Sequence, residues 1–199
     1  MRKKLSEKKS IYLSTVVCGV LLVVLVLGFI GCIWASLPVY PAFKKGVETE
    51  KELLKELEQD KVDIVYPDFL MNEYQLTDPE FYVGLESRDR FAKAEGYTIS
   101  GTYTVGEKDC VIHITADRVG NEQPRTGDVE YRGIAYDEGI ASGEKVSDVH
   151  FYHQDCSYTI YLWKYEDAEA WIDTEADVLR DIAFRMMDMA ADGDTVTKR

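Results

Sequence analysis

An uncharged apolar run near the N-terminus constrains this chain more than any other feature. The residues from Ile11 to Leu37 include no Asp, Glu, Lys or Arg. As a helix they would rise roughly 40 Å, whereas a bilayer core is about 30 Å thick. Tyr12 and Trp34 stand near the two ends of the run, where interfacial aromatic side chains belong. The run therefore predicts a single transmembrane helix over residues 11–37.

Charge is distributed unevenly around this run. Residues 1–10 form a basic tail with five bases and one acid, whereas the part from Lys44 to Arg199 holds 18 of the 23 bases and 35 of the 36 acids, a net charge of −17. Because positive flanks favour the cytoplasmic side, we expect a cytoplasmic tail and an extracytoplasmic domain at the cell membrane. A body this acidic is repelled by phosphate backbones, which argues against nucleic-acid binding.

Two other interpretations of the apolar run stay open. A cleaved signal peptide has a shorter apolar core and a small-x-small exit, whereas here Ile33 stands two residues before Ala35. The run Phe29-Ile-Gly-Cys32 resembles a bacterial lipobox, in which Cys32 would be lipidated, but apolar residues follow it instead of a polar tether. All three interpretations place the domain outside the cytoplasm.

The part beyond the run has room for one domain. Prolines at 38 and 41 end the apolar helix, and residues 38–61 are interpreted as a juxtamembrane break and a stalk helix from about Thr49 to Asp60. Residues 62–199 are interpreted as the extracytoplasmic domain. An apolar stripe on the stalk helix, which we expect to pack on the domain itself, comprises Val47, Leu53, Leu54 and Leu57.

From residue 62 onward the hydrophobic pattern alternates with a period of two. Tyr97–Val105 alternates cleanly, and a short polar connection leads to Cys110–Ala116, which predicts a hairpin. Further strands are expected at Phe81–Leu85, Val129–Tyr136, Val146–His153 and Ser157–Tyr165. These runs predict an antiparallel sheet of about five or six strands.

A helix is expected to close the chain. Thr174 is a suitable N-cap, apolar residues follow at helical spacing, and Gly193 ends the pattern. The sequence therefore predicts an α+β fold, in which an N-terminal transmembrane helix precedes an antiparallel sheet flanked by an N-terminal and a C-terminal helix.

The last strand and helix resemble a known group of domains. The run Tyr158-Thr-Ile-Tyr-Leu-Trp163 followed by Glu175-Ala-Asp-Val-Leu-Arg-Asp-Ile-Ala183 is similar to the ending of small extracytoplasmic domains attached to some Firmicute anti-sigma factors and related lipoproteins. The resemblance implies a partly open sheet wrapped on helices and used for sensing or binding, with no catalytic residues to carry over. The basic tail is too short to form a sigma-binding domain, so signalling would need a separate partner.

Two cysteines outside the apolar run could form a disulfide. Cys110 and Cys156 would lie in an oxidising compartment, and both begin a predicted strand. If the strands between them alternate strictly in direction, the two starts lie roughly 20 Å apart, whereas a bridge needs Cα atoms within about 7 Å. A bridge would therefore require one connection to cross over, and the sequence leaves this pairing open.

The sequence contains no motif for a metal, a cofactor or catalysis. His150 and His153 are three apart on a predicted strand, hence on opposite faces, and a site with His113 would need further ligands from elsewhere. Acidic residues around Gly193, which begin with Asp188, lack the spacing of a calcium loop. We therefore expect no cofactor.

An aromatic stripe on the last strand is the candidate binding face. Alternation places Tyr161, Trp163 and Tyr165 on one side and the apolar set from Tyr158 to Leu162 on the other. Such a stripe is either core, which we favour, or a groove for a peptide or an amphiphile.

The leading functional hypothesis is a non-enzymatic, membrane-anchored extracytoplasmic domain that binds or senses a partner, such as a protein or peptide of the cell envelope. The alternatives are an envelope hydrolase or modifying enzyme with a site assembled from scattered residues, and a structural subunit of a membrane complex.

Overall fold

The computed structural model describes residues 2–36, 40, 42–105, 108–119, 129–141, 145–164 and 173–198. The chain divides into two compact units. The first comprises Met1–Pro41 with Arg88–Phe91, and the second comprises Ala42–Ser87 with Ala92–Arg199.

The first unit is built on one long helix, α1 (Arg2–Ser36). Within it, Val16–Trp34 is long enough and apolar enough to cross a membrane, and none of this segment is buried. A helix of this kind near the N-terminus suits a membrane anchor and equally suits a signal sequence.

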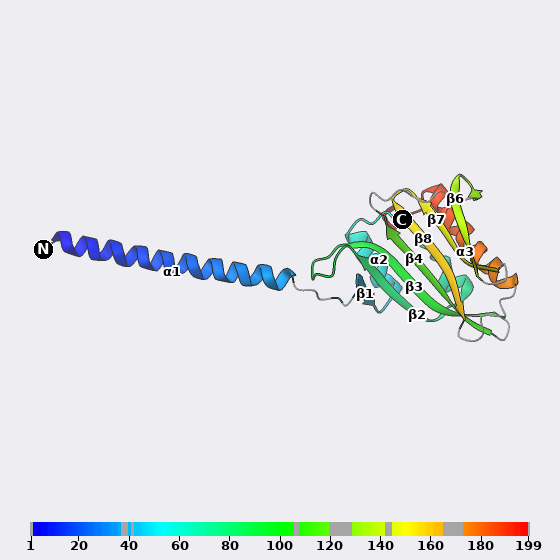
Figure 1. Cartoon of the computed structure of the whole chain (residues 1–199), viewed down its shortest axis with the longest axis horizontal. Helices are drawn as coiled ribbons and strands as arrows, with labels where there is room; N and C mark the ends of the chain where they lie inside the picture. Colours follow the sequence, from blue (N-terminus) through cyan, green and yellow to red (C-terminus); the bar gives the residue numbers. More distant parts are fainter. Residues whose placement is uncertain are drawn as a thin grey trace. The chain divides into compact units, whose positions relative to one another are not determined.

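The second unit confirms the predicted α+β fold, with an antiparallel sheet of eight strands (Figure 1). The strands are β1 (Lys44–Val47), β2 (Thr77–Leu85), β3 (Ala94–Val105), β4 (Lys108–Arg118), β5 (Val129–Tyr131), β6 (Ile134–Ala141), β7 (Lys145–His153) and β8 (Cys156–Lys164). Their order in the sheet is β1-β2-β3-β4-β8-β7-β6-β5. The last strand therefore lies in the interior of the sheet, between β4 and β7.

The strand count exceeds the expected five or six for two local reasons. The short edge strand β1 lies in the segment expected to lead into the stalk helix, where charge hides the strand pattern. The single strand expected over Val129–Tyr136 is two strands, because Arg132 and Gly133 form a tight turn with φ values of 48° and 81°. Two consecutive left-handed residues are typical of two-residue hairpin turns.

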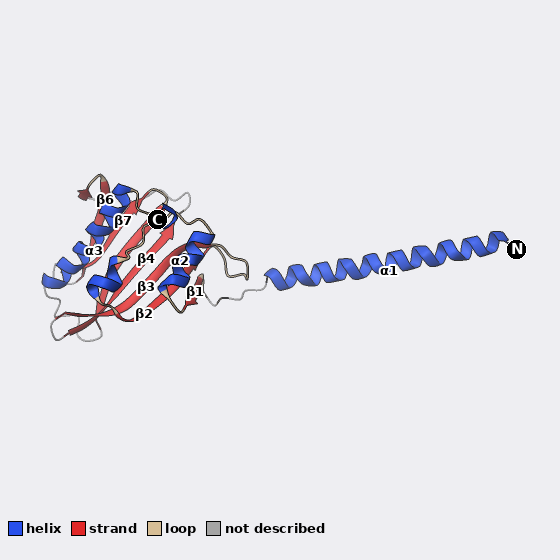
Figure 2. Ribbon diagram, turned by 180° about the vertical axis from the view of Figure 1, so that it is seen from behind, coloured by secondary structure: helices blue, strands red, loops and turns tan. Residues whose placement is uncertain are grey.

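The described helices of the second unit cover one face of the sheet, as Figure 2 shows for α2 and α3. They are α2 (Glu50–Gln59), the π-helical turn η1 (Leu70–Tyr74), α3 (Asp173–Asp192) and the 3-10 turn η3 (Val196–Lys198). The hydroxyl of Thr49 caps α2 by accepting a hydrogen bond from the N–H of Glu52 at 3.2 Å. Leu53 and Leu57 are fully buried, so the helix expected as a stalk is part of the domain.

Two tyrosines fasten the covering layer to the sheet. The Tyr97 hydroxyl donates to the carbonyl of Val65 at 2.7 Å, and the N–H of Val65 donates to the Tyr158 hydroxyl at 3.1 Å. Both tyrosine side chains are buried. Because buried polar groups need partners, these bonds hold the chain before η1 across β3 and β8.

The register between β4 and β8 resolves the question of the disulfide. Cys110 pairs with Lys164, and Cys156 pairs with Arg118, so the two cysteines lie at opposite ends of the same strand pair. Eight residues of strand separate them, or about 26 Å at about 3.3 Å per residue. No disulfide joins Cys110 and Cys156, and the strict alternation of strands is the reason. Burial raises the pKa of the Cys156 thiol to about 11, as expected for a packed side chain.

Candidate functional site: the open face of the sheet

The sheet face opposite the helices carries a continuous polar and aromatic surface, here named the open face. Cross-strand register arranges its side chains in three rows. The first row is Tyr82, Thr98, Thr115, Thr159, His150 and Asp137. The second is Glu80, Ser100, His113, Tyr161 and Asp148. The third is Lys44, Gly84, Gly96, Asp117, Ser157 and Tyr152. None of the described helices of the second unit lies on this side (Figures 1 and 2).

Aromatic and imidazole rings pair across neighbouring strands of the open face. The ring of His113 stacks on Tyr161 with centroids 4.6 Å apart, and His150 meets Tyr152 edge-on at 4.5 Å. All four side chains are half-buried. Desolvation, with a smaller contribution from the charge of Lys44, lowers the pKa of His113. This imidazole is therefore neutral at neutral pH and presents a polar ring without charge.

The charge of the open face is acidic. Its rows hold four carboxylates, from Glu80, Asp117, Asp137 and Asp148. Lys44 is the one lysine in these rows, and its ammonium group donates to the hydroxyl of Thr98 at 3.0 Å. The surface therefore complements a cationic ligand.

Two glycines make room for one of these carboxylates. A Cβ atom at Gly96 would lie 2.7 Å from a carboxylate oxygen of Asp117, and a Cβ atom at Gly84 would lie 3.0 Å from it. Desolvation raises the pKa of Asp117, against the opposing effect of the Lys44 charge and with a smaller contribution from Glu95. The paired glycines thus let the carboxylate lie against the sheet, although Asp117 as a whole stays exposed.

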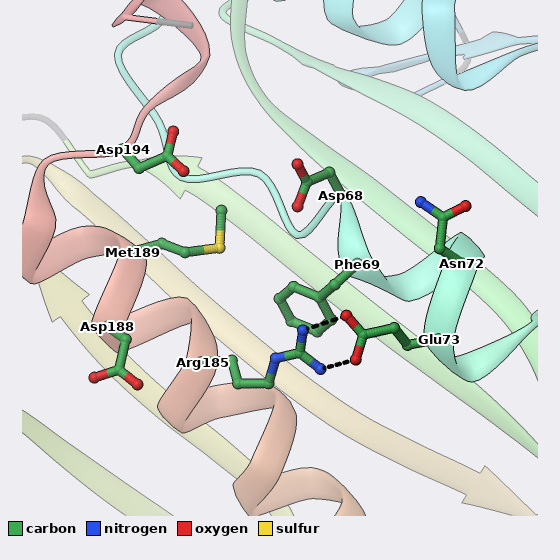
Figure 3. A pocket seen from close by; sticks show the side chains of 8 residues that line it. All are labelled: Asp68, Phe69, Asn72, Glu73, Arg185, Asp188, Met189 and Asp194. Carbon is green, nitrogen blue, oxygen red and sulfur yellow. Dashed lines mark hydrogen bonds and ion pairs between the residues drawn. The ribbon is translucent and has the colours of Figure 1, made fainter.

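A separate hollow of about 470 Å³ opens on the helix side, between η1 and the end of α3 (Figure 3). It is lined by Asp68, Phe69, Asn72, Glu73, Arg185, Asp188, Met189 and Asp194. The Arg185 guanidinium donates two hydrogen bonds of 2.7 Å to Glu73 and lies 3.8 Å from the centre of the Phe69 ring. The arginine of this hollow is therefore already engaged by the protein itself.

Acidic residues at the end of α3 have a structural partner. Arg132 in the turn between β5 and β6 donates to Asp188 and to Asp192, each at 3.0 Å. Two of the carboxylates at this helix end therefore pair with an arginine of the same chain. No cluster of three or more metal-binding side chains occurs within the ranges that the structure describes.

The structure places only part of the predicted aromatic face. Tyr161 lies on the open face, half-buried and stacked on His113. Trp163 pairs with Val111 in the β4–β8 ladder, and Tyr165 lies outside the described residues. The grouping of these three residues as a binding face stays a prediction. No pattern in the sequence joins His113 to Tyr161, because only the register of β4 with β8 brings them together.

Comparisons with protein-family models, with curated proteins and with solved structures found no match. The resemblance to anti-sigma-associated domains therefore stays a prediction. The molecule is defined by its own features, a membrane-compatible helix followed by an α+β domain with one covered and one open sheet face. Its function must be argued from the open face.

Proposed function

We propose that this chain is a membrane-anchored, extracytoplasmic binding domain of the cell envelope, non-enzymatic, which binds a basic segment of a partner protein on the open face. The single observation that carries the proposal is the difference between the two sheet faces. One face is apolar and covered by helices. The other carries half-buried rings together with hydroxyls and carboxylates, and none of the described helices of the second unit covers it.

The anchor rests on α1 and on the charges beside it. The segment Val16–Trp34 is fully apolar on all sides, which suits lipid rather than a protein core. The basic tail before it favours retention of the tail in the cytoplasm. A cysteine at Ser6 should then be shielded from a membrane-impermeant thiol reagent in intact cells, whereas a cysteine at Lys198 should react. The reverse pattern would contradict the localisation.

The partner class follows from charge and from ring chemistry. Carboxylates of the open face attract lysine and arginine side chains, and the neutral rings of His113, Tyr161 and Tyr152 offer them faces or edges for close contact. The net charge of −17 beyond the helix would also speed the approach of a cationic partner at low salt.

Charge-matched variants test the binding surface. The full chain in nanodiscs of neutral lipid would be titrated with an oligolysine peptide. Glu80→Gln combined with Asp117→Asn removes two charges from the open face, and Glu58→Gln combined with Asp177→Asn removes two from exposed helix positions. We expect the first pair to weaken binding by about tenfold and the second by less than about twofold. Equal losses of affinity in the two double variants would show that the peptide responds only to the net charge of the protein, and would contradict a site on the open face.

One observation favours a hydrolase as the second candidate function. The Nε2 atom of His150 lies 2.9 Å from the hydroxyl oxygen of Ser157, and Asp137 stands directly opposite His150 in the sheet. This is the order of acid, base and nucleophile used in acyl transfer. However, Ser157 pairs on both sides, with Asp117 and Tyr152, so the ladder engages the backbone groups that could stabilise an oxyanion.

A serine-directed fluorophosphonate probe separates the two candidate functions. Binding by the open face predicts no labelling of the full chain. Labelling that disappears in Ser157→Ala and persists in Thr159→Ala would establish the hydrolase and displace the binding proposal.

A further inference from the structure

A short arginine-rich segment lies at the C-terminal end of the membrane-compatible helix. Arg88–Phe91 belongs to the same compact unit as α1. The N–H of Tyr40 donates to the carbonyl of Arg88 at 3.2 Å, and the Arg90 guanidinium lies 3.5 Å from the centre of the Trp34 ring. Trp34 is the last residue of the candidate span, so these contacts place the segment where a bilayer interface would lie.

The chemistry of this segment differs from that of the acidic body. Two of its four residues are arginines, and its carboxylate, on Asp89, accepts a hydrogen bond from the N–H of Phe91 at 2.9 Å. The Phe91 side chain is 69% exposed, whereas the next most exposed large apolar side chains described beyond the helix are Phe43 at 52% and Val129 at 50%. An exposed phenyl ring next to an arginine is costly in water and favourable at a lipid interface.

We propose that Arg88–Phe91 binds the lipid headgroup layer, with Phe91 in the interface and Arg88 and Arg90 on the phosphates of anionic lipids. The inference rests on the proposed membrane anchor and adds a second contact with the bilayer. Guanidinium groups suit this role because their planar donors match phosphate oxygens, and the contact of Arg90 with Trp34 orients one of them at the helix end. Trp34 and Phe91 then act as neighbouring interfacial aromatics.

Quenching by brominated lipids tests this contact in the full chain. Phe91→Trp would be reconstituted in vesicles of phosphatidylcholine, with or without phosphatidylglycerol, whose acyl chains carry bromine close to the headgroup. The matched control is Val129→Trp, an exposed apolar position on β5. The difference from the parent protein isolates the new indole. We expect several-fold stronger quenching for Phe91→Trp than for Val129→Trp, and a further increase with phosphatidylglycerol.

Charge variants complete the test. Arg88→Gln with Arg90→Gln, added to Phe91→Trp, should abolish the dependence on phosphatidylglycerol, whereas Lys51→Gln with Lys55→Gln on α2 should preserve it. Free inorganic phosphate at millimolar concentration should not compete with the vesicles. Quenching of Phe91→Trp no greater than that of Val129→Trp, or quenching insensitive to the arginine pair, would overturn the proposal.

Flotation of the vesicles keeps this inference separate from the anchor. A chain that fails to float with the vesicles would overturn the anchor and this inference together. A chain that floats while the new indole stays unquenched would overturn the loop contact alone.

Discussion

The two faces of the sheet use alternate residues of the same strands and differ in almost every other respect. On β8, Tyr158 and Ile160 are at most 1% exposed beneath the helices. Thr159 and Tyr161, their immediate neighbours, are half-buried on the open face. The residues of the covered face must be apolar because they are buried beneath the helices. The residues of the open face are not constrained in this way, so they can serve solubility and contacts with a partner. Stability should therefore be concentrated on one face, and recognition on the other.

The sharpest test of this division compares neighbouring residues of one strand. Ile160→Ala removes a fully buried side chain and should lower the free energy of unfolding by about 2–5 kcal/mol. Thr159→Ala should cost less than about 1 kcal/mol, because this side chain is half-buried on the open face. Urea unfolding of the full chain in detergent, followed by near-ultraviolet circular dichroism, would measure both. Similar costs for the two variants would contradict the division.

A second test concerns the packing beneath Asp117. In Gly96→Ala the new Cβ atom would overlap the carbonyl oxygen of Ala116 and crowd the Asp117 carboxylate, so we expect a loss of about 1–3 kcal/mol. Gly46→Ala in β1 is the matched control. Its Cβ atom would meet only two ring carbons of Tyr82, at 3.6 and 3.8 Å, which are ordinary contacts. This substitution should change stability by less than about 0.5 kcal/mol. The same unfolding assay decides between them, and a neutral Gly96→Ala would show that the carboxylate is not held against the sheet.

A third test uses pH to probe the contact between Asp63 and the 3-10 turn η3 near the C-terminus. The Asp63 carboxylate accepts hydrogen bonds from the hydroxyls of Thr195 and Thr197, and these bonds lower its pKa. A lowered folded-state pKa means that the stabilisation is complete above the ordinary aspartate value of about 4 and disappears as pH falls through the folded-state value. Asp63→Asn should therefore cost about 1 kcal/mol at pH 7, and the difference from the parent should shrink below about pH 4.

The control for this pH test is Glu58→Gln, which removes a charge from an exposed position on α2. Its unfolding free energy should follow that of the parent across the same pH range. An Asp63→Asn deficit that stays constant in acid would contradict the role of the carboxylate charge.

Much of the fold followed from local patterns in the sequence. Period-two alternation located the long strands. The helix expected from about Thr49 to Asp60 corresponds to α2, and the stop expected at Gly193 follows directly on α3. Such local patterns could not predict the order of the strands in the sheet, because this order is set by contacts between distant segments. The short edge strand β1 carries two lysines in four residues, so charge masked it.

The candidate site was less predictable than the fold. Alternation placed Tyr161 and Ile160 on different sides of β8. Because both sides of this strand carry apolar or aromatic residues, the pattern could not show which side the helices cover. The partners of Tyr161 come from β4 and β7, and only the pairing of β8 between those strands creates the open face. A binding surface made by register leaves no contiguous signature in the sequence.

A last, small expected effect bears most directly on function. Tyr161 stacks on His113 but is otherwise half-exposed, so Tyr161→Ala should cost only about 1 kcal/mol, the value of one aromatic contact. Tyr158→Ala, on the covered face of the same strand, should cost roughly 3–5 kcal/mol by comparison with other aromatic truncations in packed cores. Tyr161→Phe retains the ring and should match the parent within about 0.5 kcal/mol. If Tyr161→Ala were as costly as Tyr158→Ala, another part of the chain would have to cover the open face in solution. The partner would then have no free surface to bind, because the side chains that distinguish the two faces would all be core.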